Sequence, residues 1–292
     1  MIKYFIIIFT SFISTTYVLR AATAEEIFVK NGSLTIGIVS AVPGESGQIL
    51  ELMEAPTSYE KGRRTYYQGK LYGIDTVLVA SRIGKVAAAA TTAHLILEYN
   101  VDLIIFTGVA GAIDPSLSIG DIVIANALIQ HDMDARPFCP IFEIPLLKIK
   151  ECPPDPLLES LAVQASQQFV DKELIEIIPQ TVLNEFNITH PSVKTGLVIT
   201  GDQVISQDIQ KAQLRERLPL ALCVEMEGAS LSQVCYEYGI PYAVIRTISD
   251  YANHENTPVD VKKFVSQVSG YYSSAIIKNI YSLVHARINI MR

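Results

Sequence analysis

The segment LCVEMEGASLSQVC (222–235) places two carboxylates, Glu225 and Glu227, on either side of Met226 in an otherwise apolar run. Burying an ionised carboxylate is costly unless a specific partner holds it. If a strand ends here, both acids lie at the rim of a crevice, and strand alternation points them away from Met226. Two carboxylates so placed can accept hydrogen bonds from vicinal sugar hydroxyls. The alternative is that either acid caps a helix over 228–239.

Two further acids stand at the ends of expected strands. Glu45 follows LTIGIVSAV (34–42), and Asp250 ends PYAVIRTISD directly after Ser249. Each has a structural alternative, because an acid in the first turn of a helix supports its dipole or caps it. In a partly dry crevice, such a carboxyl group can instead act as a general acid or base. Acids from three strand ends on one crevice edge, with no cluster of histidines to bind a metal, indicate acid–base chemistry.

Strand and helix patterns alternate along the chain, with Gly and Pro between them. This alternation predicts one α/β domain, with a twisted, mixed central sheet flanked by helices. Ligands of such sheets bind beyond the carboxyl ends of the strands, where Gly108–Gly111 and Asp202 should join the acids. Strands are expected at 34–42, 64–81 (a hairpin turning at Gly73), 102–112, 121–130, 193–202, 221–226 and 241–250, and helices at 44–55, 84–100, 157–170, 209–218, 228–239 and 258–287.

The Pro-rich stretch 131–156 is too broken for a regular element and is expected to be a long loop or lid. His131, Asp132 and Asp134 within it could bind a metal, but no second histidine lies nearby. We therefore predict no metal and no cofactor. His94, in the Ala-rich helix, is expected to be structural.

The first 24 residues differ in character from the rest. Lys3 precedes an apolar stretch, and Ala22-Thr23-Ala24 has the small-x-small pattern of a signal-peptidase site. We predict an export signal cut after Ala24, which leaves 25–292 as the catalytic domain in the periplasm or outside the cell. The alternative is an uncleaved anchor, although the stretch is short for a membrane span.

The cysteines, the net charge and the missing motifs bear on disulfide bonding, on the partners of the protein and on its class of ligand. In an exported protein Cys139 and Cys152 could pair, whereas Cys223 and Cys235 are expected to be buried small hydrophobic residues. The 292 residues include 30 acidic and 23 basic ones, a net charge of −7 that argues against nucleic acid or an anionic membrane as partner. The P-loop, GxGxxG and GxSxG patterns are all missing from the sequence.

Six segments in this order resemble the methylthioadenosine/S-adenosylhomocysteine nucleosidases of the nucleoside phosphorylase superfamily. The resemblance covers about residues 34 to 287 and implies a mixed sheet surrounded by helices, a homodimer and a small nucleoside as substrate. The segments are LTIGIVSAVPGESGQI, SRIGKVAAAATTAHL, IIFTGVAGAIDPSLSIGDIVIA, VITGDQVI, CVEMEGASLSQVC and PYAVIRTISDYA.

The resemblance also implies a role for each matching residue. Glu45 would activate water for attack on the ribose anomeric carbon, and Asp250 would protonate N7 of adenine. Glu227 would hold the ribose hydroxyls. The remaining substrate-binding positions are Met226 against the sugar, Glu225, Ser249 beside the acid, Val204 and Ile205 at the adenine edge, Val109, Ile83 near the alkylthio end, and Phe138 in a lid from the partner subunit.

Several positions depart from the family pattern and leave the substrate open. The turn SAVPGESGQ has no basic residue to hold phosphate, which predicts hydrolysis rather than phosphorolysis. Arg82 stands where a small residue is usual, and Arg136 could meet a homocysteine carboxylate or pair with Asp132 or Asp134. The alternatives are a hydrolase of futalosine or adenosine, a phosphate-dependent phosphorylase, or a non-catalytic nucleoside-binding protein.

Overall fold

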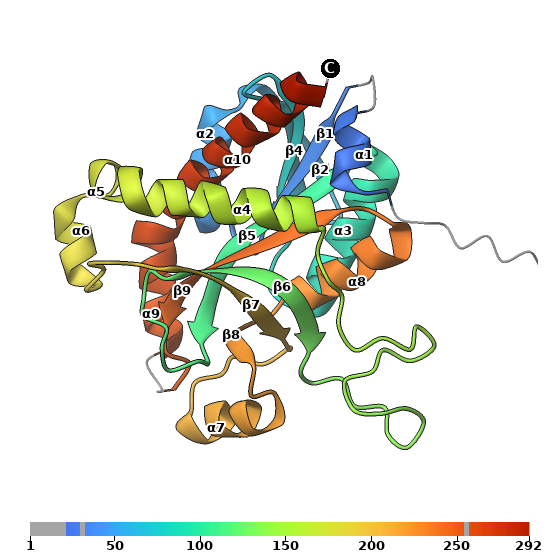
Figure 1. Ribbon diagram of the computed structural model, residues 1–292, viewed down its shortest axis with the longest axis vertical. Helices are drawn as coiled ribbons and strands as arrows, with labels where there is room; N and C mark the ends of the chain where they lie inside the picture. Colours follow the sequence, from blue (N-terminus) through green and yellow to red (C-terminus); the bar gives the residue numbers. More distant parts are fainter. Residues whose placement is uncertain (1–21, 30–32, 254–256, 292) are drawn as a thin grey trace, which may run out of the picture.

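The computed structural model describes residues 22–29, 33–253 and 257–291 (Figure 1). Its strands are β1 (Thr35–Ser40), β2 (Glu54–Lys61), β3 (Arg64–Leu71), β4 (Ile74–Ala80), β5 (Leu103–Ala112), β6 (Ile122–Gln130), β7 (Val193–Thr200), β8 (Ala221–Glu225) and β9 (Tyr242–Asp250). Its α-helices are α1 (Ala24–Val29), α2 (Gly47–Leu52), α3 (Lys85–Tyr99), α4 (Pro156–Gln168), α5 (Leu174–Ile177), α6 (Gln180–Glu185), α7 (Asp208–Arg217), α8 (Gly228–Tyr238), α9 (Thr257–Phe264) and α10 (Gly270–Met291).

The described strands form one mixed, nine-stranded sheet. β1 pairs in parallel with β4 and β5, and β3 and β4 form the predicted antiparallel hairpin. β5 pairs in parallel with β9 along its length and antiparallel with β8 at its end. β9 also pairs with β6, β6 with β7, and β7 with β8. Together with β5, these strands therefore close this part of the sheet into a ring. The predicted fold class is confirmed.

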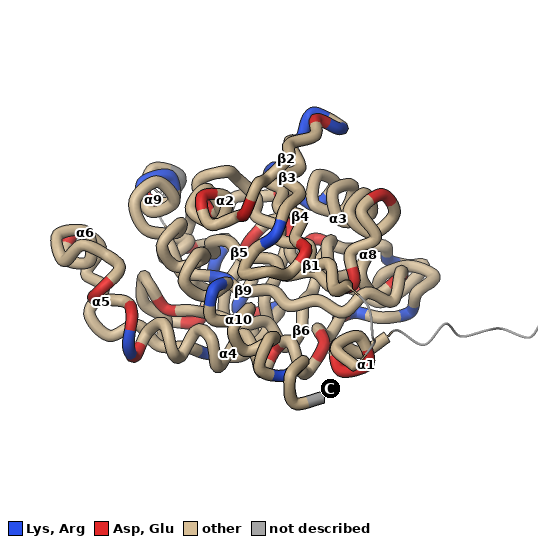
Figure 2. Tube along the Cα trace, turned by 90° about the horizontal axis from the view of Figure 1, so that it is seen from above, with Lys and Arg blue, Asp and Glu red and all other residues tan. Residues whose placement is uncertain are grey.

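Helices cover both faces of the sheet, as the alternation predicts. In β1, Ile36 and Ile38 belong to a core with α1, α4 and α10, whereas Val39 belongs to a core with α3 and α8. Figure 2 shows these two groups of helices on opposite sides of the strands. Successive strand residues point to opposite faces, so a strand buried on both faces reads as a continuous apolar run.

Two expected elements differ in the structure. The helix expected over 44–55 is shorter, because α2 ends at Leu52 and β2 begins at Glu54. Every residue of β2 is exposed, so its sequence carries no alternating hydrophobic signal. Gly108–Gly111, expected beyond the carboxyl end of a strand, lie within β5, which extends to Ala112.

The loop 131–156 contains no helix or named strand before α4, and the prediction of a long irregular segment is confirmed. The disulfide considered between Cys139 and Cys152 is not formed. All four cysteines lie in the described part of the chain and are free thiols. His94 packs edge-on against the rings of Tyr66 and Tyr99, which stack on each other, a structural role as expected.

Residues 1–21 of the predicted export signal lie outside the described residues. Ala24, the last residue before the predicted cut, is the first residue of α1 and is fully buried. Its N–H donates to the Asp155 carboxylate. The cleavage itself stays a prediction. Within the described part of the chain, no helix combines the length and apolar character needed to cross a membrane.

Candidate active site

The main candidate site is a cavity of about 230 Å³ at the carboxyl ends of β1, β8 and β9 and the outer half of β5. Every predicted catalytic or substrate-binding residue except Phe138 lines it. Those residues are Glu45, Ile83, Val109, Val204, Ile205, Glu225, Met226, Glu227, Ser249 and Asp250. Asp202, also expected at this edge, does not line the cavity and accepts the N–H of Lys85 at the start of α3.

Glu45 ends a short 3₁₀ turn, Pro43–Glu45, that follows β1. Its side chain is held by three main-chain donors. One carboxylate oxygen accepts the N–H groups of Ala41 (2.7 Å) and Val42 (3.0 Å), and the other accepts that of Val109 (3.1 Å). The residue is only 2% exposed. Burial raises the pKa of Glu45, while Arg246 and the three N–H groups oppose that rise. Such a carboxylate is positioned as a proton acceptor.

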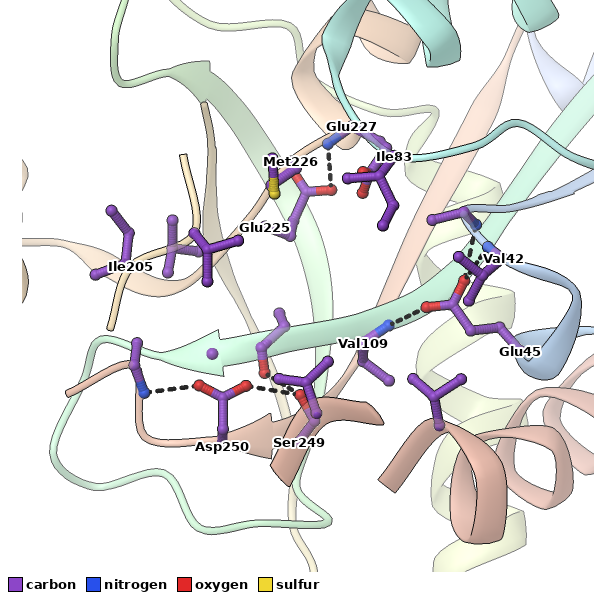
Figure 3. A pocket seen from close by; sticks show the side chains of 18 of the residues that line it. Val42, Glu45, Ile83, Val109, Ile205, Glu225, Met226, Glu227, Ser249 and Asp250 are labelled. Carbon is purple, nitrogen blue, oxygen red and sulfur yellow. Dashed lines mark hydrogen bonds between the residues drawn. The ribbon is translucent and has the colours of Figure 1, made fainter. Parts of the chain in front are cut away.

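Asp250 ends β9 and is also buried. One of its carboxylate oxygens accepts the N–H of Ala252 (2.7 Å) and the other accepts the hydroxyl of Ser249 (2.8 Å). Figure 3 shows Asp250 and Ile205 toward one end of the cavity and Glu45 toward the other. The two acids that sequence reasoning selected therefore lie in one cavity, at different ends of it.

The two glutamates of the VEME segment, Glu225 and Glu227, differ in how many contacts their carboxylates make within the protein. The Glu225 carboxylate accepts the N–H groups of Glu227 (3.0 Å) and Gly228 (2.7 Å), so it caps the start of α8. It also accepts the Thr200 hydroxyl and pairs with Arg246. Its oxygens are therefore engaged within the protein, and the capping alternative describes Glu225 better than substrate binding does.

Glu227 makes fewer contacts within the protein. One of its oxygens accepts the N–H of Gly84 (2.9 Å), and the other lies 3.9 Å from Arg246. Burial, and then the charge of Glu225, raise the pKa of Glu227. β8 ends at Glu225, so strand alternation does not extend to Met226, which lines the cavity instead of facing away from it. That detail of the prediction is wrong.

Arg246 is a functional residue that sequence reasoning missed. It is fully buried in β9, forms an ion pair with Glu225, and stacks its guanidinium 4.1 Å from the centre of the Phe106 ring. Its Nε and Nη1 have no hydrogen-bond partner among the described residues. A signal was available, because a single arginine inside the apolar strand YAVIRTIS must have a buried partner.

Gly108 in β5 leaves the space that Arg246 occupies. A Cβ at this position would lie 2.2 Å from Nη1 of Arg246 and 3.1 Å from Oε1 of Glu45. The glycine therefore lets the Arg246 guanidinium and the Glu45 carboxylate approach the same point of β5.

Replacing Arg246 with Met is expected to lower the free energy of unfolding by about 3–5 kcal/mol, because it leaves Glu225 buried without its counter-ion. Urea denaturation measures this loss. The matched control is the double variant Glu225→Gln/Arg246→Met, which removes both charges and should recover much of the stability. A single variant as stable as the wild type would contradict this account of the pair.

The residues around the mouth of the cavity are more exposed. Ile83 and Val204 line it from the open side, and both are more than half exposed. Phe138 is 92% exposed and does not line the cavity of its own chain. Its role in a lid from a partner subunit stays a prediction. Arg136 forms an ion pair with Asp134 (2.6 Å), the structural pairing that the sequence left as one of two alternatives.

Residues 35–280 match the model of the phosphorylase superfamily. The chain therefore belongs to this superfamily, and its relatives place it among the 5′-methylthioadenosine/S-adenosylhomocysteine nucleosidases, as the sequence motifs predicted. One such nucleosidase, from Shewanella halifaxensis, is 33% identical over 244 residues, which cover 84% of this chain and 97% of the relative.

Solved structures agree with this placement. The nucleosidase of Colwellia psychrerythraea, determined in complex with adenine, has a TM-score of 0.74 and 31% identity, covering 86% of this chain and 96% of that one. The futalosine hydrolase of Helicobacter pylori has a TM-score of 0.71 and 30% identity, covering 86% and 98%. One of these structures is named as a nucleosidase and the other as a hydrolase.

Proposed function

We propose that this protein hydrolyses the N-glycosidic bond of 5′-methylthioadenosine and S-adenosylhomocysteine and releases adenine. The observation that carries the proposal is that Glu45 and Asp250 line one small cavity from different ends, with Glu227 between them (Figure 3). The similarity to curated nucleosidases along nearly their whole length supports the same reaction.

The chemistry follows from the two ends of the cavity. As the bond between C1′ and N9 breaks, the sugar becomes oxocarbenium-like and the base gains negative charge. A proton from Asp250 to N7 of adenine neutralises the leaving base. Glu45 takes a proton from a water molecule whose oxygen bonds to C1′. Glu227, with an oxygen not engaged by a main-chain donor of the described residues, accepts hydrogen bonds from the ribose hydroxyls and holds C1′ in place.

Water rather than phosphate is the proposed nucleophile. The turn after β1 carries the buried, acidic Glu45 and no basic residue, and the charge of Arg246 is countered by Glu225. We therefore expect adenine release to be equally fast in phosphate-free buffer and with added phosphate, as measured by chromatography of the free base. A rate that depends on phosphate, with a sugar phosphate as product, would show a phosphorylase instead.

The pH dependence of kcat/KM should show the raised pKa of Glu45. The base must be ionised to accept a proton, so activity is lost as the pH falls through its pKa in the free enzyme. Because burial raises that pKa, the acid limb should have its midpoint clearly above about 4.3, the value for an exposed glutamate. A limb at the exposed value, or none, would mean that Glu45 is not the base.

Futalosine is a second candidate substrate, because a futalosine hydrolase is among the similar solved structures. The apolar Val109 and Val204 at the wall of the cavity leave this choice open. Incubation with methylthioadenosine, S-adenosylhomocysteine, futalosine, adenosine and inosine, followed by chromatography of the released base, separates these activities. Release from none of them would indicate a non-catalytic binding protein.

We further propose that the protein is exported and acts as a homodimer. The N-terminal charge pattern and Ala22-Thr23-Ala24 support export, and the exposed Phe138 offers an apolar side chain to a second copy. N-terminal sequencing of the secreted or periplasmic protein tests the first proposal. Sedimentation analysis, with Phe138→Ser beside the wild type, tests the second.

A further inference from the structure

A second cavity, of about 430 Å³, adjoins the candidate active site. The two cavities share Ala41, Val42 and Ile83 as lining residues. The second one extends from these residues toward α2 and the start of β3. Three arginines line it and none lines the first: Arg63, Arg64 and Arg82.

The positive charge of this cavity is not neutralised by the described part of the protein. The Arg64 guanidinium donates to the carbonyl groups of Gly62, Ser81 and Ala87, and Arg82 donates to that of Arg63 (2.7 Å). None of the three arginines forms an ion pair within the described residues. Three such guanidinium groups around one cavity are unusual in a chain of net charge −7, and they favour an anionic ligand.

The main chain at Arg82 adds a second observation. Its φ of +73° lies in the left-handed region, which is unfavourable for a residue with a Cβ. A glycine would adopt the same conformation without this cost. An arginine placed here, against its backbone preference and beside the active site, is more readily explained by a function of its guanidinium.

The direction of the cavity identifies the part of the substrate that would reach it. In the proposed function Asp250 protonates the base, Glu45 activates water beside C1′, and Glu227 holds the ribose hydroxyls. The 5′ position then lies toward Val42 and Ile83, away from Asp250 (Figure 3). These two residues are also shared with the arginine-lined cavity. A 5′ substituent longer than methylthio would extend from one cavity into the other.

We propose that Arg63, Arg64 and Arg82 form a subsite for the carboxylate of a charged 5′ substituent, such as the homocysteine tail of S-adenosylhomocysteine. This inference rests on the proposed function and deepens it. Arg136 does not serve this purpose, because Asp134 already pairs with it. Free phosphate is an anion of the same chemistry. The subsite, however, lies apart from the reacting atoms, because Glu45 and Asp250 line the first cavity and neither lines the second.

The test compares kcat/KM of the purified protein for three substrates: methylthioadenosine, S-adenosylhomocysteine and the carboxamide of S-adenosylhomocysteine. The wild type should prefer the acid over the amide by about 10-fold, the size of a partly exposed charge-assisted contact. Added salt should reduce this preference. Two variants should each remove most of the preference for the acid and leave kcat/KM for methylthioadenosine nearly unchanged: Arg82→Gly, which suits the backbone at +73°, and Arg63→Ala. Arg82→Lys should keep part of the preference for the acid.

The control is Lys61→Ala, which removes one positive charge from the same hairpin at a residue that does not line the cavity. It should leave all three substrates unaffected. Equal kcat/KM for acid and amide in the wild type, or an equal effect of Arg82→Gly on all three substrates, would overturn the subsite. Inhibition by inorganic phosphate that is lost in Arg82→Gly, without discrimination between acid and amide, would assign the cavity to free phosphate. If the subsite is overturned but the wild type still cleaves methylthioadenosine, the proposed function is unaffected. If the wild type cleaves none of the three substrates, both the proposed function and the subsite are wrong.

Discussion

Replacing Asp250 with Asn is expected to lower kcat for adenine release about 10³-fold, within the range that general acid catalysis contributes. Asparagine keeps the shape of the side chain: its carbonyl oxygen can still accept the Ala252 N–H, and its amide nitrogen, in the place of the other oxygen, can donate to the Ser249 hydroxyl. It has no proton to transfer to N7. Adenine must then leave as an anion, which raises the barrier. Steady-state kinetics with methylthioadenosine measure the loss.

A substrate with a better leaving group separates proton transfer from a loss of structure. Nitrophenolate departs without protonation, so Asp250→Asn should cleave 4-nitrophenyl β-D-riboside almost as fast as the wild type. Asp202→Asn is a matched control, because Asp202 follows a strand end but does not line the cavity. If Asp250→Asn lost both substrates to the same extent, Asp250 would not be the general acid.

Replacing Glu45 with Gln should lower kcat by about 10³-fold or more on both the nucleoside and the nitrophenyl riboside, because each needs an activated water molecule. This pattern differs from that of Asp250→Asn and assigns each acid to one end of the reaction. The introduced glutamine cannot accept from all three N–H donors, since its amide nitrogen faces either Val109 or the pair Ala41 and Val42.

A loss of structure must therefore be measured alongside the kinetics of Glu45→Gln. One unmatched buried donor costs about 1–3 kcal/mol, which thermal unfolding would detect. Binding of adenine, followed by calorimetry, should remain close to that of the wild type. A variant that retains more than about a tenth of the wild-type rate, with adenine binding intact, would exclude Glu45 as the base, because a general base contributes at least about 10²-fold.

Much of the fold and the positions of the key acids follow from the sequence. Short β-branched runs alternate with helical periodicity, so a layered α/β sheet is predictable, and the rule for the carboxyl ends of strands brings Glu45 and Asp250 to one edge. These acids can be identified in the sequence because a charged residue at the end of an apolar run is costly to bury without a specific partner. The structure places both of them in one cavity.

The contacts between side chains were less predictable. Glu225 and Glu227 look equivalent in the sequence, and only the position of Arg246 across the sheet separates the capping residue from the one that faces the cavity. Gly108 was expected to follow a strand, whereas it lies within β5 and makes room for the Arg246 guanidinium. The proposed role of Arg82 depends on a cavity formed with the hairpin β2–β3. Because every residue of β2 is exposed, no hydrophobic pattern in the sequence predicts this strand, and the cavity could not be predicted either.

In the proposed mechanism, Glu45 delivers water to C1′ from the side opposite the base that Asp250 protonates. The most direct measurement is hydrolysis of methylthioadenosine in H₂¹⁸O, with the sugar product analysed by mass spectrometry and by NMR before its anomers equilibrate. We expect one ¹⁸O atom on C1′ of methylthioribose and the α-anomer as the first product. A sugar that carries no label, or a labelled β-anomer formed first, would contradict the arrangement of acid and base described here.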